Sequence, residues 1–378
     1  MDDINKTLTR GVEQILPDTE GLKKLMESRK ITLYQGFDPT NKSLHIGNFI
    51  GLRKLAQFQK LGHKVIFLIG DFTGMIGDPT DKKATRQRLT KNEVQDNLAS
   101  FKDQASSVLS FDGENAAEVR FNSEWLSKLN FEDIVDLASN FTVQQMIERS
   151  MYAERLKNKK PIYLHEFFYP LMQGYDSVAM DVDLEIGGND QLFNMLAGRA
   201  LMKSLKGKEK YVLTTKLLVD SQGLKMGKTT GNAIFMDNTP TDIYGKMMAI
   251  TDDMIELGVE LLTDLGNVDL TNPMEAKKQL AYEVVKQIKG EEEAKESAEH
   301  FQNTFQNNNV DYSNEIEYTE YLADAVANVI GSKSEAKRLI EQKAVDVNDA
   351  VVDNPIYKLE GGEKIKIGKK NFVKIRRP

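Results

Sequence analysis

The sequence predicts an α/β protein built on a Rossmann-type, doubly wound parallel sheet, followed by an all-α domain and a small α+β module. Residues 33–48 have the pattern of a buried strand, a Gly/Asp/Pro turn and the start of a helix. Residues 65–69 form the unbroken apolar run Val-Ile-Phe-Leu-Ile, which is typical of a parallel strand covered on both faces. After Ala233 the glycine-rich α/β character gives way to helical patterns.

The first helix of this sheet is predicted to begin by Asn48 and to continue beyond it. From there the apolar residues recur with a helical period, at Phe49, Ile50, Leu52, Leu55, Ala56, Phe58 and Leu61. A strand, a helix and a second strand within roughly forty residues form a βαβ unit. Ligands bind such sheets at the carboxyl ends of the strands. We therefore expect the turn at residues 36–48 and the loop at residues 71–79 to lie together at one binding edge.

The turn before this helix has the composition of a phosphate-binding site. A helix N-terminus presents unpaired backbone N–H groups and the positive end of the helix dipole. Gly36 and Gly47 allow a ligand close to the backbone, and Thr40, His45 and Asn48 add polar side chains. We interpret the turn as a cradle for nucleotide phosphates. The alternative is that His45 is an ordinary helix cap or a packed core histidine.

A second polar group is predicted on one face of a later helix. Tyr169, Gln173 and Asp176 are spaced i, i+4 and i+7 within an apolar segment, and Pro170 fits the first turn of that helix. Buried hydrogen-bonding groups need partners. These three side chains therefore either bind a polar ligand or contact other side chains of the core.

Two turns carry further candidate residues. Residues 183–186 have the pattern of a short strand, and Gly187 to Gln191 then form a turn that opens a helix. This turn either approaches a ligand closely or is a plain capped helix start. Asp78 is a candidate partner for a substrate ammonium, or a turn aspartate before proline. Residues 81–91 carry five Lys and Arg residues, as in a basic loop near phosphate or in a solvated face.

Composition bounds the location and the partners. The 378 residues include no cysteine, which excludes disulfides and thiolate metal sites and suits a reducing cytosol. The sequence has neither a signal-peptide pattern nor an apolar run that would span a bilayer, so we expect a cytoplasmic protein without a membrane partner. We recognise no cluster of metal ligands. The net charge of −7 argues against a generic nucleic-acid coat protein, and no DNA partner is expected.

The C-terminal residues differ from the rest in charge and pattern. Residues 331–378 hold 12 Lys and Arg against 7 Asp and Glu, so they carry +5 while the preceding chain carries −12. We predict a helix at 332–342 and strands at 345–347, 364–367 and 372–375. Basic residues alternate with apolar ones here, so one face is either a polyanion contact or a solvated surface. The polar run 302–309 is interpreted as a linker before this module.

Two short motifs resemble the signature elements of class I aminoacyl-tRNA synthetases. Residues 45–48, His-Ile-Gly-Asn, are similar to the His-Ile-Gly-His element, and residues 225–229, Lys-Met-Gly-Lys-Thr, to the Lys-Met-Ser-Lys-Ser loop. Asn48 departs from the first pattern, and Gly227 and Thr229 depart from the second. With Tyr34, the set on the later helix resembles the tyrosine pocket of bacterial tyrosyl-tRNA synthetases. The C-terminal module resembles the RNA-binding module named after ribosomal protein S-four.

The resemblance implies three groups of site residues. The departing pyrophosphate would be stabilised by Thr40, His45, Asn48, Lys225, Lys228 and Thr229. Tyrosine would be bound by Tyr34, Asp78, Tyr169, Gln173, Asp176 and Gln191, with Tyr34 and Asp176 at the phenol hydroxyl and Asp78, Tyr169 and Gln173 at the α-ammonium. ATP would contact Gly36, Asp38, Gly47, Gly188, Asp190 and Lys228, and the 187–191 turn would reach the ribose and the adenylate.

The implied activity is that of a tyrosine–tRNA ligase. L-Tyrosine would react with ATP to give tyrosyl-adenylate and pyrophosphate, and tyrosine would then pass to the 3′ end of tRNA(Tyr). Mg²⁺ would arrive with ATP, since no dedicated metal site is recognised. The implied domains are a catalytic domain at 1–232, a helical anticodon-binding domain at 233–309 and the RNA-binding module at 314–378. An inserted segment of short helices at about 122–160 would form a homodimer interface, or pack into the core.

Three other functions stay open at this point. A tryptophanyl-tRNA synthetase shares the fold and both motifs, but an indole N–H needs one acceptor and not the pair formed by Tyr34 and Asp176. A cytidylyltransferase has a His-x-Gly-His element, but it would explain neither the late lysine loop nor the C-terminal module. A non-catalytic RNA-binding relative is suggested by Asn48.

Overall fold

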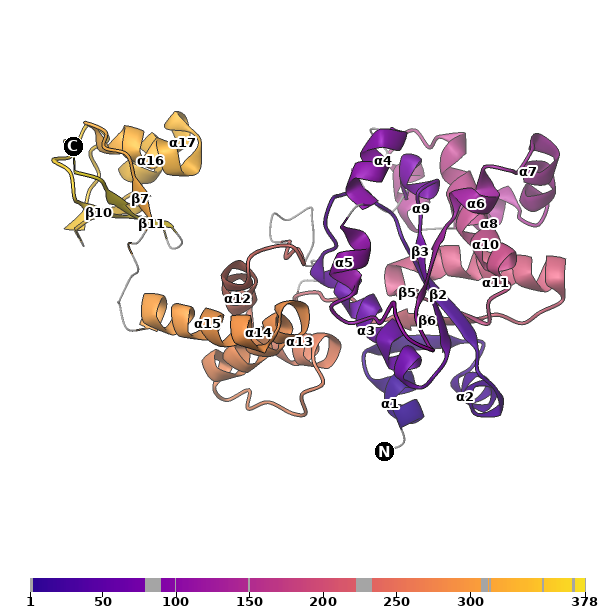
Figure 1. The fold of residues 1–378 in the computed structure, drawn as a ribbon. Helices are drawn as coiled ribbons and strands as arrows, with labels where there is room; N and C mark the ends of the chain where they lie inside the picture. The colour runs from indigo at the N-terminus through magenta and orange to yellow at the C-terminus, as the bar shows by residue number, and fades with distance from the viewer. Residues whose placement is uncertain are drawn as a thin grey trace. The chain divides into compact units, whose positions relative to one another are not determined.

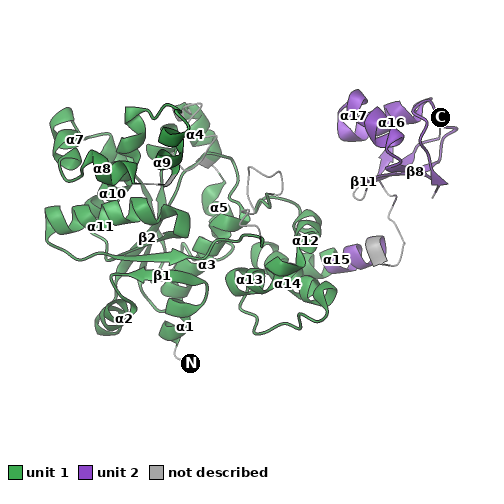
Figure 2. Ribbon diagram, turned by 180° about the vertical axis from the view of Figure 1, so that it is seen from behind, with its two compact units in different colours: residues 1–297 green, residues 298–378 purple. Residues whose placement is uncertain are grey.

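The computed structural model describes residues 3–78, 90–98, 100–148, 150–221, 233–306, 312, 314–348, 350–368 and 371–377. The predicted lysine loop at 225–229 and most of the basic segment at 81–91 lie outside these residues. Contacts divide the chain into two units, residues 1–297 and residues 298–378 (Figure 2). Each unit is described by itself.

The first unit is organised by a six-stranded sheet with the order β1-β6-β5-β2-β3-β4. The strands β6, β5, β2, β3 and β4 are parallel, and β1 joins the edge of β6 in the antiparallel direction. This confirms the predicted Rossmann-type parallel sheet. The strands are β1 (Val12–Leu16), β2 (Thr32–Phe37), β3 (Lys64–Ile69), β4 (Glu118–Phe121), β5 (Leu184–Gly188) and β6 (Tyr211–Thr215).

Helices cover both faces of this sheet (Figure 1). Successive side chains of a strand point to opposite faces, and β2 shows the consequence. Gln35 lies against Gly51 of α3 (Ile46–Lys60), whereas the neighbouring Tyr34 lies against α10 (Phe168–Met180). A third helix, α11 (Leu192–Lys206), packs along α10 on the same face as Tyr34. The predicted βαβ unit is therefore formed by β2, α3 and β3.

Two predictions about helix ends are confirmed. His45 is the N-cap of α3, so the helix begins at Ile46, within the segment 33–48 that is predicted to contain its start. Pro170 is the third residue of α10, where its missing N–H costs no intrahelical hydrogen bond.

The first unit contains shorter helices at its periphery. The segment 122–160 is helical, as predicted, but its apolar residues have divided roles. Leu137 is buried against Val178 and Leu201, whereas Phe131 is 81% exposed. Besides α3, α10 and α11, the described residues before 222 form eight further α-helices. They are α1 (Asp3–Thr9), α2 (Thr19–Ser28), α4 (Lys91–Leu98), α5 (Phe101–Ala105), α6 (Ser123–Leu126), α7 (Phe131–Ala138), α8 (Val143–Ile147) and α9 (Ser150–Lys157).

The residues after 233 are helical, as the sequence predicts. They form α12 (Pro240–Met248), α13 (Ile255–Leu262), α14 (Pro273–Lys289) and α15 (Glu291–Phe301). The predicted linker at 302–309 is wrong in its first part, because Gln302–Gln306 continues as a π-helical turn. Polar composition alone does not distinguish a linker from an exposed helical turn.

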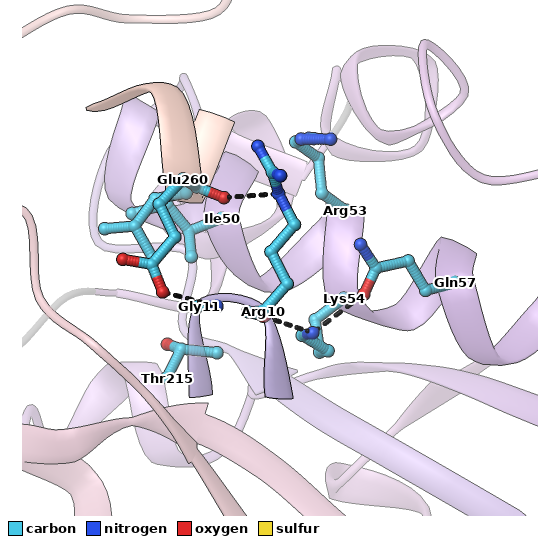
Figure 3. Close-up of a pocket in the computed structure, with 9 residues that line it drawn as sticks. Arg10, Gly11, Ile50, Arg53, Lys54, Gln57, Thr215 and Glu260 are labelled. Atoms are coloured by element: carbon cyan, nitrogen blue, oxygen red, sulfur yellow. Dashed lines mark hydrogen bonds between the residues drawn. The ribbon is translucent and has the colours of Figure 1, made fainter. Parts of the chain in front are cut away.

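Buried cations join α13 to the sheet around a small cavity (Figure 3). Arg10 donates to the carbonyl oxygens of Val259 and Glu260, at 2.9 and 3.1 Å, and so satisfies part of the C-terminal end of α13. Lys54 of α3 donates to the Arg10 carbonyl, and burial beside Arg53 and Arg10 lowers the pKa of Lys54 to about 7. The cavity has about 10 Å³ of free space, enough for about one water molecule. The residues that line it connect α13 to α3 and to the start of β1, and they are distinct from the predicted binding edge.

The second unit is the predicted α+β module. Its sheet has the order β7-β11-β10-β8-β9, and α16 and α17 pack on it around a core that includes Val326, Ile340 and Ile365. The elements are β7 (Glu315–Ile316), α16 (Leu322–Ile330), α17 (Lys333–Glu341), β8 (Val345–Val347), β9 (Ala350–Val351), β10 (Lys364–Ile367) and β11 (Asn371–Ile375). Four of them (α17, β8, β10 and β11) agree with the predicted helix and three strands to within about one residue at each end, whereas α16, β7 and β9 were not predicted.

Across the described ranges of both units, no helix is long and apolar enough to cross a membrane.

Candidate functional site

The N-terminus of α3 is held by a reciprocal capping box. The His45 ring accepts a hydrogen bond at Nδ1 from the Asn48 backbone N–H at 3.2 Å, and the Asn48 Oδ1 accepts one from the His45 backbone N–H at 3.0 Å. The capping role considered for His45 is therefore present. Because Nδ1 is the acceptor, Nε2 of the neutral ring carries the proton. Asn48 likewise uses its oxygen in the cap, which leaves its Nδ2 amide as the donating half of the side chain.

Asp38, at the end of β2, connects three segments of the binding edge. Its Oδ1 accepts from Thr73 Oγ1 and its Oδ2 accepts from Tyr169 Oη, both at 2.7 Å. Gly70 ends β3 beside it, and a Cβ on Gly70 would lie 1.9 Å from Asp38 Oδ1. Glycine is therefore required there. The turn at residues 36–48 and the loop that begins at Asp71 do lie together, as predicted.

Asp176 is a buried carboxylate with two side-chain donors from the β4 end of the sheet. Its Oδ1 accepts from the Trp125 indole N–H at 2.7 Å, and its Oδ2 accepts from Asn122 Nδ2 at 3.3 Å. Burial raises the pKa of Asp176 well above its usual value, while the two donors act in the opposite direction. Asn122 also donates to Thr73 Oγ1 at 2.9 Å, which links Asp176 to the Asp38 cluster.

Tyr34 and Gln173 share a second buried network behind this edge. The Tyr34 hydroxyl lies 2.9 Å from Ser177 Oγ, and burial raises the pKa of Tyr34 well above its usual value. Gln173 donates through Nε2 to Glu185 Oε1 at 2.9 Å. Glu185 of β5 is paired with Lys210, which precedes β6 and is fully buried.

The 187–191 turn joins the site through Gln191. Gln191 Nε2 donates to Asp78 Oδ2 at 2.8 Å, and its Oε1 accepts from Asn194 at 3.0 Å. In this part of the described chain, neither Gly188 nor Gln191 makes a side-chain cap bond to the helix that follows. The plain capped helix start is therefore wrong. Asp78 likewise has a long-range partner, beyond what a local turn aspartate needs.

The structure brings most of the predicted site residues to one edge of the sheet. Gly36 and Gly188 lie at the ends of β2 and β5, Thr40 and Asp190 follow these two strands, and Gly47 lies in the first turn of α3. The predicted Lys225, Lys228 and Thr229 lie outside the described residues. The sequence did not identify the residues that hydrogen-bond to these predicted site residues or to one another behind them, namely Thr73, Asn122, Trp125, Ser177, Glu185 and Lys210. The one available signal was Glu185, a charged residue inside an otherwise apolar strand pattern.

The arrangement offers distinct chemistry at two ends. One end presents the carboxylates of Asp38, Asp78 and Asp176, which accept hydrogen bonds and favour a ligand that carries an ammonium and a hydroxyl. The other end presents the N-terminus of α3, which favours phosphate. A ligand with both kinds of group, such as an amino acid joined to a nucleotide, fits the edge as a whole.

Comparison with known proteins gives two family matches. A family model described as tRNA synthetases class I (W and Y) matches residues 26–306, and a model described as S4 domain matches residues 325–365. The chain is 41% identical over 393 residues to the tyrosine–tRNA ligase of Desulfotalea psychrophila, covering 97% of this chain and 96% of that one. It is 38% identical to the tyrosine–tRNA ligase of Thermotoga maritima, covering 98% and 96%.

Solved structures share the fold of the first unit. A C-terminally truncated mitochondrial tyrosyl-tRNA synthetase of Coccidioides posadasii has a TM-score of 0.64 at 25% identity, covering 79% of this chain and 91% of that one. A tyrosyl-tRNA synthetase of Archaeoglobus fulgidus, complexed with L-tyrosine, has a TM-score of 0.61 at 21% identity, covering 79% and 100%.

The indole of Trp125 should report the titration of Asp176. Trp125 is the only tryptophan of the chain, and its N–H donates to the Asp176 carboxylate. Since burial raises the pKa of Asp176, we expect the tryptophan emission to change with a midpoint well above the ordinary aspartate value of about 3.9. The measurement is a fluorescence pH titration. Asp176→Asn should abolish this transition, and the control Asp181→Asn, on an exposed residue at the end of the same helix, should retain it. A transition that survives Asp176→Asn would contradict the assignment.

Proposed function

The chain belongs to the class I tRNA synthetases of the tryptophan and tyrosine type, and we propose that it is a tyrosine–tRNA ligase. The observation that carries this proposal is the 38–41% identity to tyrosine–tRNA ligases over 97% or more of the chain. The enzyme would activate L-tyrosine with ATP to tyrosyl-adenylate and then transfer tyrosine to the 3′ end of tRNA(Tyr).

The choice of tyrosine over phenylalanine is assigned to Tyr34 and Asp176. A phenol hydroxyl donates one hydrogen bond and accepts others, so it can satisfy both the Asp176 carboxylate and the Tyr34 hydroxyl. Both side chains are buried, with exposed fractions of 3% and 0%. Phenylalanine would leave them without that partner, which costs about 1–3 kcal/mol for each neutral group and more for a charged one. A tyrosyl enzyme is the standard illustration of this asymmetry.

The α-ammonium of tyrosine is assigned to Asp78, Tyr169 and Gln173. Gln173 donates its amide N–H to Glu185. The side-chain carbonyl oxygen of Gln173 therefore stays available to accept a hydrogen bond from the ammonium. Gln191 completes this end through its hydrogen bond to Asp78. Asp38, Gly36, Gly47, Gly188 and Asp190 are assigned to ATP and the adenylate.

The chemical step needs position and charge stabilisation more than a protein nucleophile. The carboxylate of tyrosine attacks the α-phosphorus of ATP in line, and pyrophosphate leaves. Thr40, His45 and Asn48 lie at the N-terminus of α3, where side-chain donors and the helix dipole would stabilise the departing charge. Lys225, Lys228 and Thr229 are assigned to the same role from the sequence motif. We propose that Mg²⁺ accompanies ATP, because it binds chiefly through substrate phosphates in such sites.

The second unit is assigned to tRNA binding through one face of its sheet. Ile365 and Val373 are buried in the core, so Lys364, Lys366 and Lys374 alternate with them onto the opposite face. Lys374 pairs with Glu315 at 3.9 Å and Lys366 with Asp346 at 3.3 Å, so part of the predicted basic face is neutralised within the module. The Lys364 ammonium lies 5.1 Å from the centre of the Tyr312 ring. This cation and ring would suit a nucleic-acid contact.

We also propose that two copies associate through the 122–160 segment together with residues 161–164, which follow it directly. Of the large apolar side chains that are exposed in the described chain, six of thirteen lie between residues 131 and 164. They are Phe131, Val135, Val143, Leu156, Tyr163 and Leu164. Such a concentration of exposed apolar side chains is typical of an interaction surface. The remaining domain boundaries and the cytoplasmic location stay as the sequence predicts them.

Amino-acid-dependent exchange of pyrophosphate into ATP tests the activity. Among the twenty amino acids, only tyrosine should support exchange, and the bound adenylate should then charge tRNA. Lys364→Glu should lower charging and leave exchange unchanged, since Lys364 belongs to the second unit, and charging should weaken as salt rises. Exchange driven by tryptophan would refute the proposed function.

Asn48→Asp separates catalysis from helix capping. An aspartate keeps the oxygen that accepts from the His45 N–H, but it replaces the Nδ2 donor with a negative oxygen. We expect exchange to slow by about 10- to 100-fold, the value of one hydrogen bond to a charged group, with the thermal stability preserved. Asn48→His, which supplies a ring N–H, is the matched control and should retain activity. An unaltered rate in Asn48→Asp would show that Asn48 serves only as a cap.

Leu164→Asp tests the interface between copies. Leu164 is 71% exposed, so a charge there should leave the fold intact but disfavour burial against a second copy. We expect sedimentation to show a dimer for the wild type and a shift to monomer for Leu164→Asp. The control Leu270→Asp changes another exposed leucine, outside this segment, and should stay dimeric. A wild-type monomer would contradict the proposed association.

A further inference from the structure

Three buried residues behind the binding edge are not used by the proposed reaction. Lys210, Glu185 and Ser177 have exposed fractions of 0%, 2% and 0%, and they form one hydrogen-bonded cluster that ends at Tyr34. An ammonium and a carboxylate removed from water are costly unless their remaining donors and acceptors are satisfied. A cluster of this kind beside a ligand-facing hydroxyl can decide which way that hydroxyl points.

The Lys210 ammonium fixes one side of Ser177. It donates to Ser177 Oγ at 2.9 Å, to the Met195 carbonyl at 3.1 Å and to Glu185 Oε2. All three of its protons therefore have acceptors. A serine hydroxyl has one proton and two lone pairs, so the bond from Lys210 leaves one proton and one lone pair on Ser177.

The distances around Ser177 indicate where its proton goes. Tyr34 Oη lies at 2.9 Å, whereas Glu185 Oε2 lies at 3.4 Å and already accepts from Lys210. Hydroxyl hydrogen bonds fall between about 2.5 and 3.0 Å, so the contact with Tyr34 is the effective one. Either hydroxyl can be the donor of the contact between Ser177 and Tyr34, and we take Ser177 as the donor. The proton of Tyr34 is then left facing the Gln173 carbonyl at 3.5 Å, too far for a strong bond, and the Glu185 carboxylate, which competes with a ligand for it.

From this geometry we propose that Lys210, acting through Ser177, holds the Tyr34 hydroxyl so that it donates its proton to the phenol oxygen of the substrate. The chain of donors runs from Lys210 to Ser177 to Tyr34 and then to tyrosine, whose own proton goes to Asp176. Aligned hydrogen bonds of this kind polarise and strengthen one another. Ser177 and Lys210 are thus positioning residues for tyrosine selectivity. The inference rests on the proposed function, because it takes tyrosine as the substrate.

The close packing of two helices keeps this cluster in place. A Cβ on Gly198 of α11 would lie 2.5 Å from Lys210 Nζ and 2.9 Å from Ser177 Oγ. A Cβ on Gly174 of α10 would lie 3.1 Å from the Gly198 backbone N. Glycine at both positions lets α10 and α11 approach closely enough for Lys210 to reach Ser177.

Ser177→Ala tests the proposal, because it removes the hydroxyl and keeps the Lys210–Glu185 pair. The kcat/KM of pyrophosphate exchange is measured with tyrosine and with phenylalanine on the same preparation, so any loss of folded protein cancels in their ratio. We expect the value for tyrosine to fall about tenfold, the worth of one buried hydrogen bond, while the value for phenylalanine stays nearly unchanged. The control Ser28→Ala, on an exposed serine at the end of α2, should leave both values unchanged.

A double mutant shows whether Ser177 acts through Tyr34. In the Tyr34→Phe background, Ser177→Ala should cause no further loss of the tyrosine-to-phenylalanine ratio, because the relay has already lost its last member. An equal further loss in that background would overturn the proposal, as would an unchanged ratio in Ser177→Ala alone. Wild-type protein without tyrosine-dependent exchange would instead refute the proposed function itself.

Discussion

The binding edge depends on the buried ion pair between Lys210 and Glu185. Removing both charges from water costs several kcal/mol for each ion, and the pair persists because Ser177, Gln173 and the Met195 carbonyl satisfy what remains. Loss of either partner alone would leave an uncompensated buried charge, at a typical cost of about 3–5 kcal/mol. Because Glu185 lies in β5 and also accepts hydrogen bonds from Gln173 and Ser177 of α10, it ties this helix, which carries several predicted site residues, to the sheet.

Local sequence patterns were sufficient to predict much of the fold and part of the candidate site. The apolar run at 65–69 and the helical period after Asn48 identify the βαβ unit, because both depend only on local burial. The spacing of Tyr169, Gln173 and Asp176 correctly places them on one buried helix. The capping box of α3 was considered only as an alternative, although His45 and Asn48 have the spacing that it requires.

Contacts of long range in the sequence could not be predicted in the same way. Lys210 is 33 residues from Ser177, and Trp125 is 51 residues from Asp176, so no local period relates them. The antiparallel edge strand β1 pairs with β6 from the other end of the domain, and its five residues carry no alternating pattern strong enough to identify it. The polar run at 302–306 forms a helical turn, which its composition alone does not indicate.

The dispersed origin of the binding edge ties ligand binding to the folding equilibrium. Asp38, Asn122, Asp176 and Glu185 follow or belong to four separate segments of the chain, and they meet only when the sheet is complete. The unfolded chain therefore has no binding site for the amino acid. By mass action, a ligand that binds at this edge adds about 2.7 kcal/mol to the free energy of unfolding when its free concentration is a hundred times its dissociation constant. The supply of substrate thus raises the folded fraction of the enzyme as well as its rate of turnover.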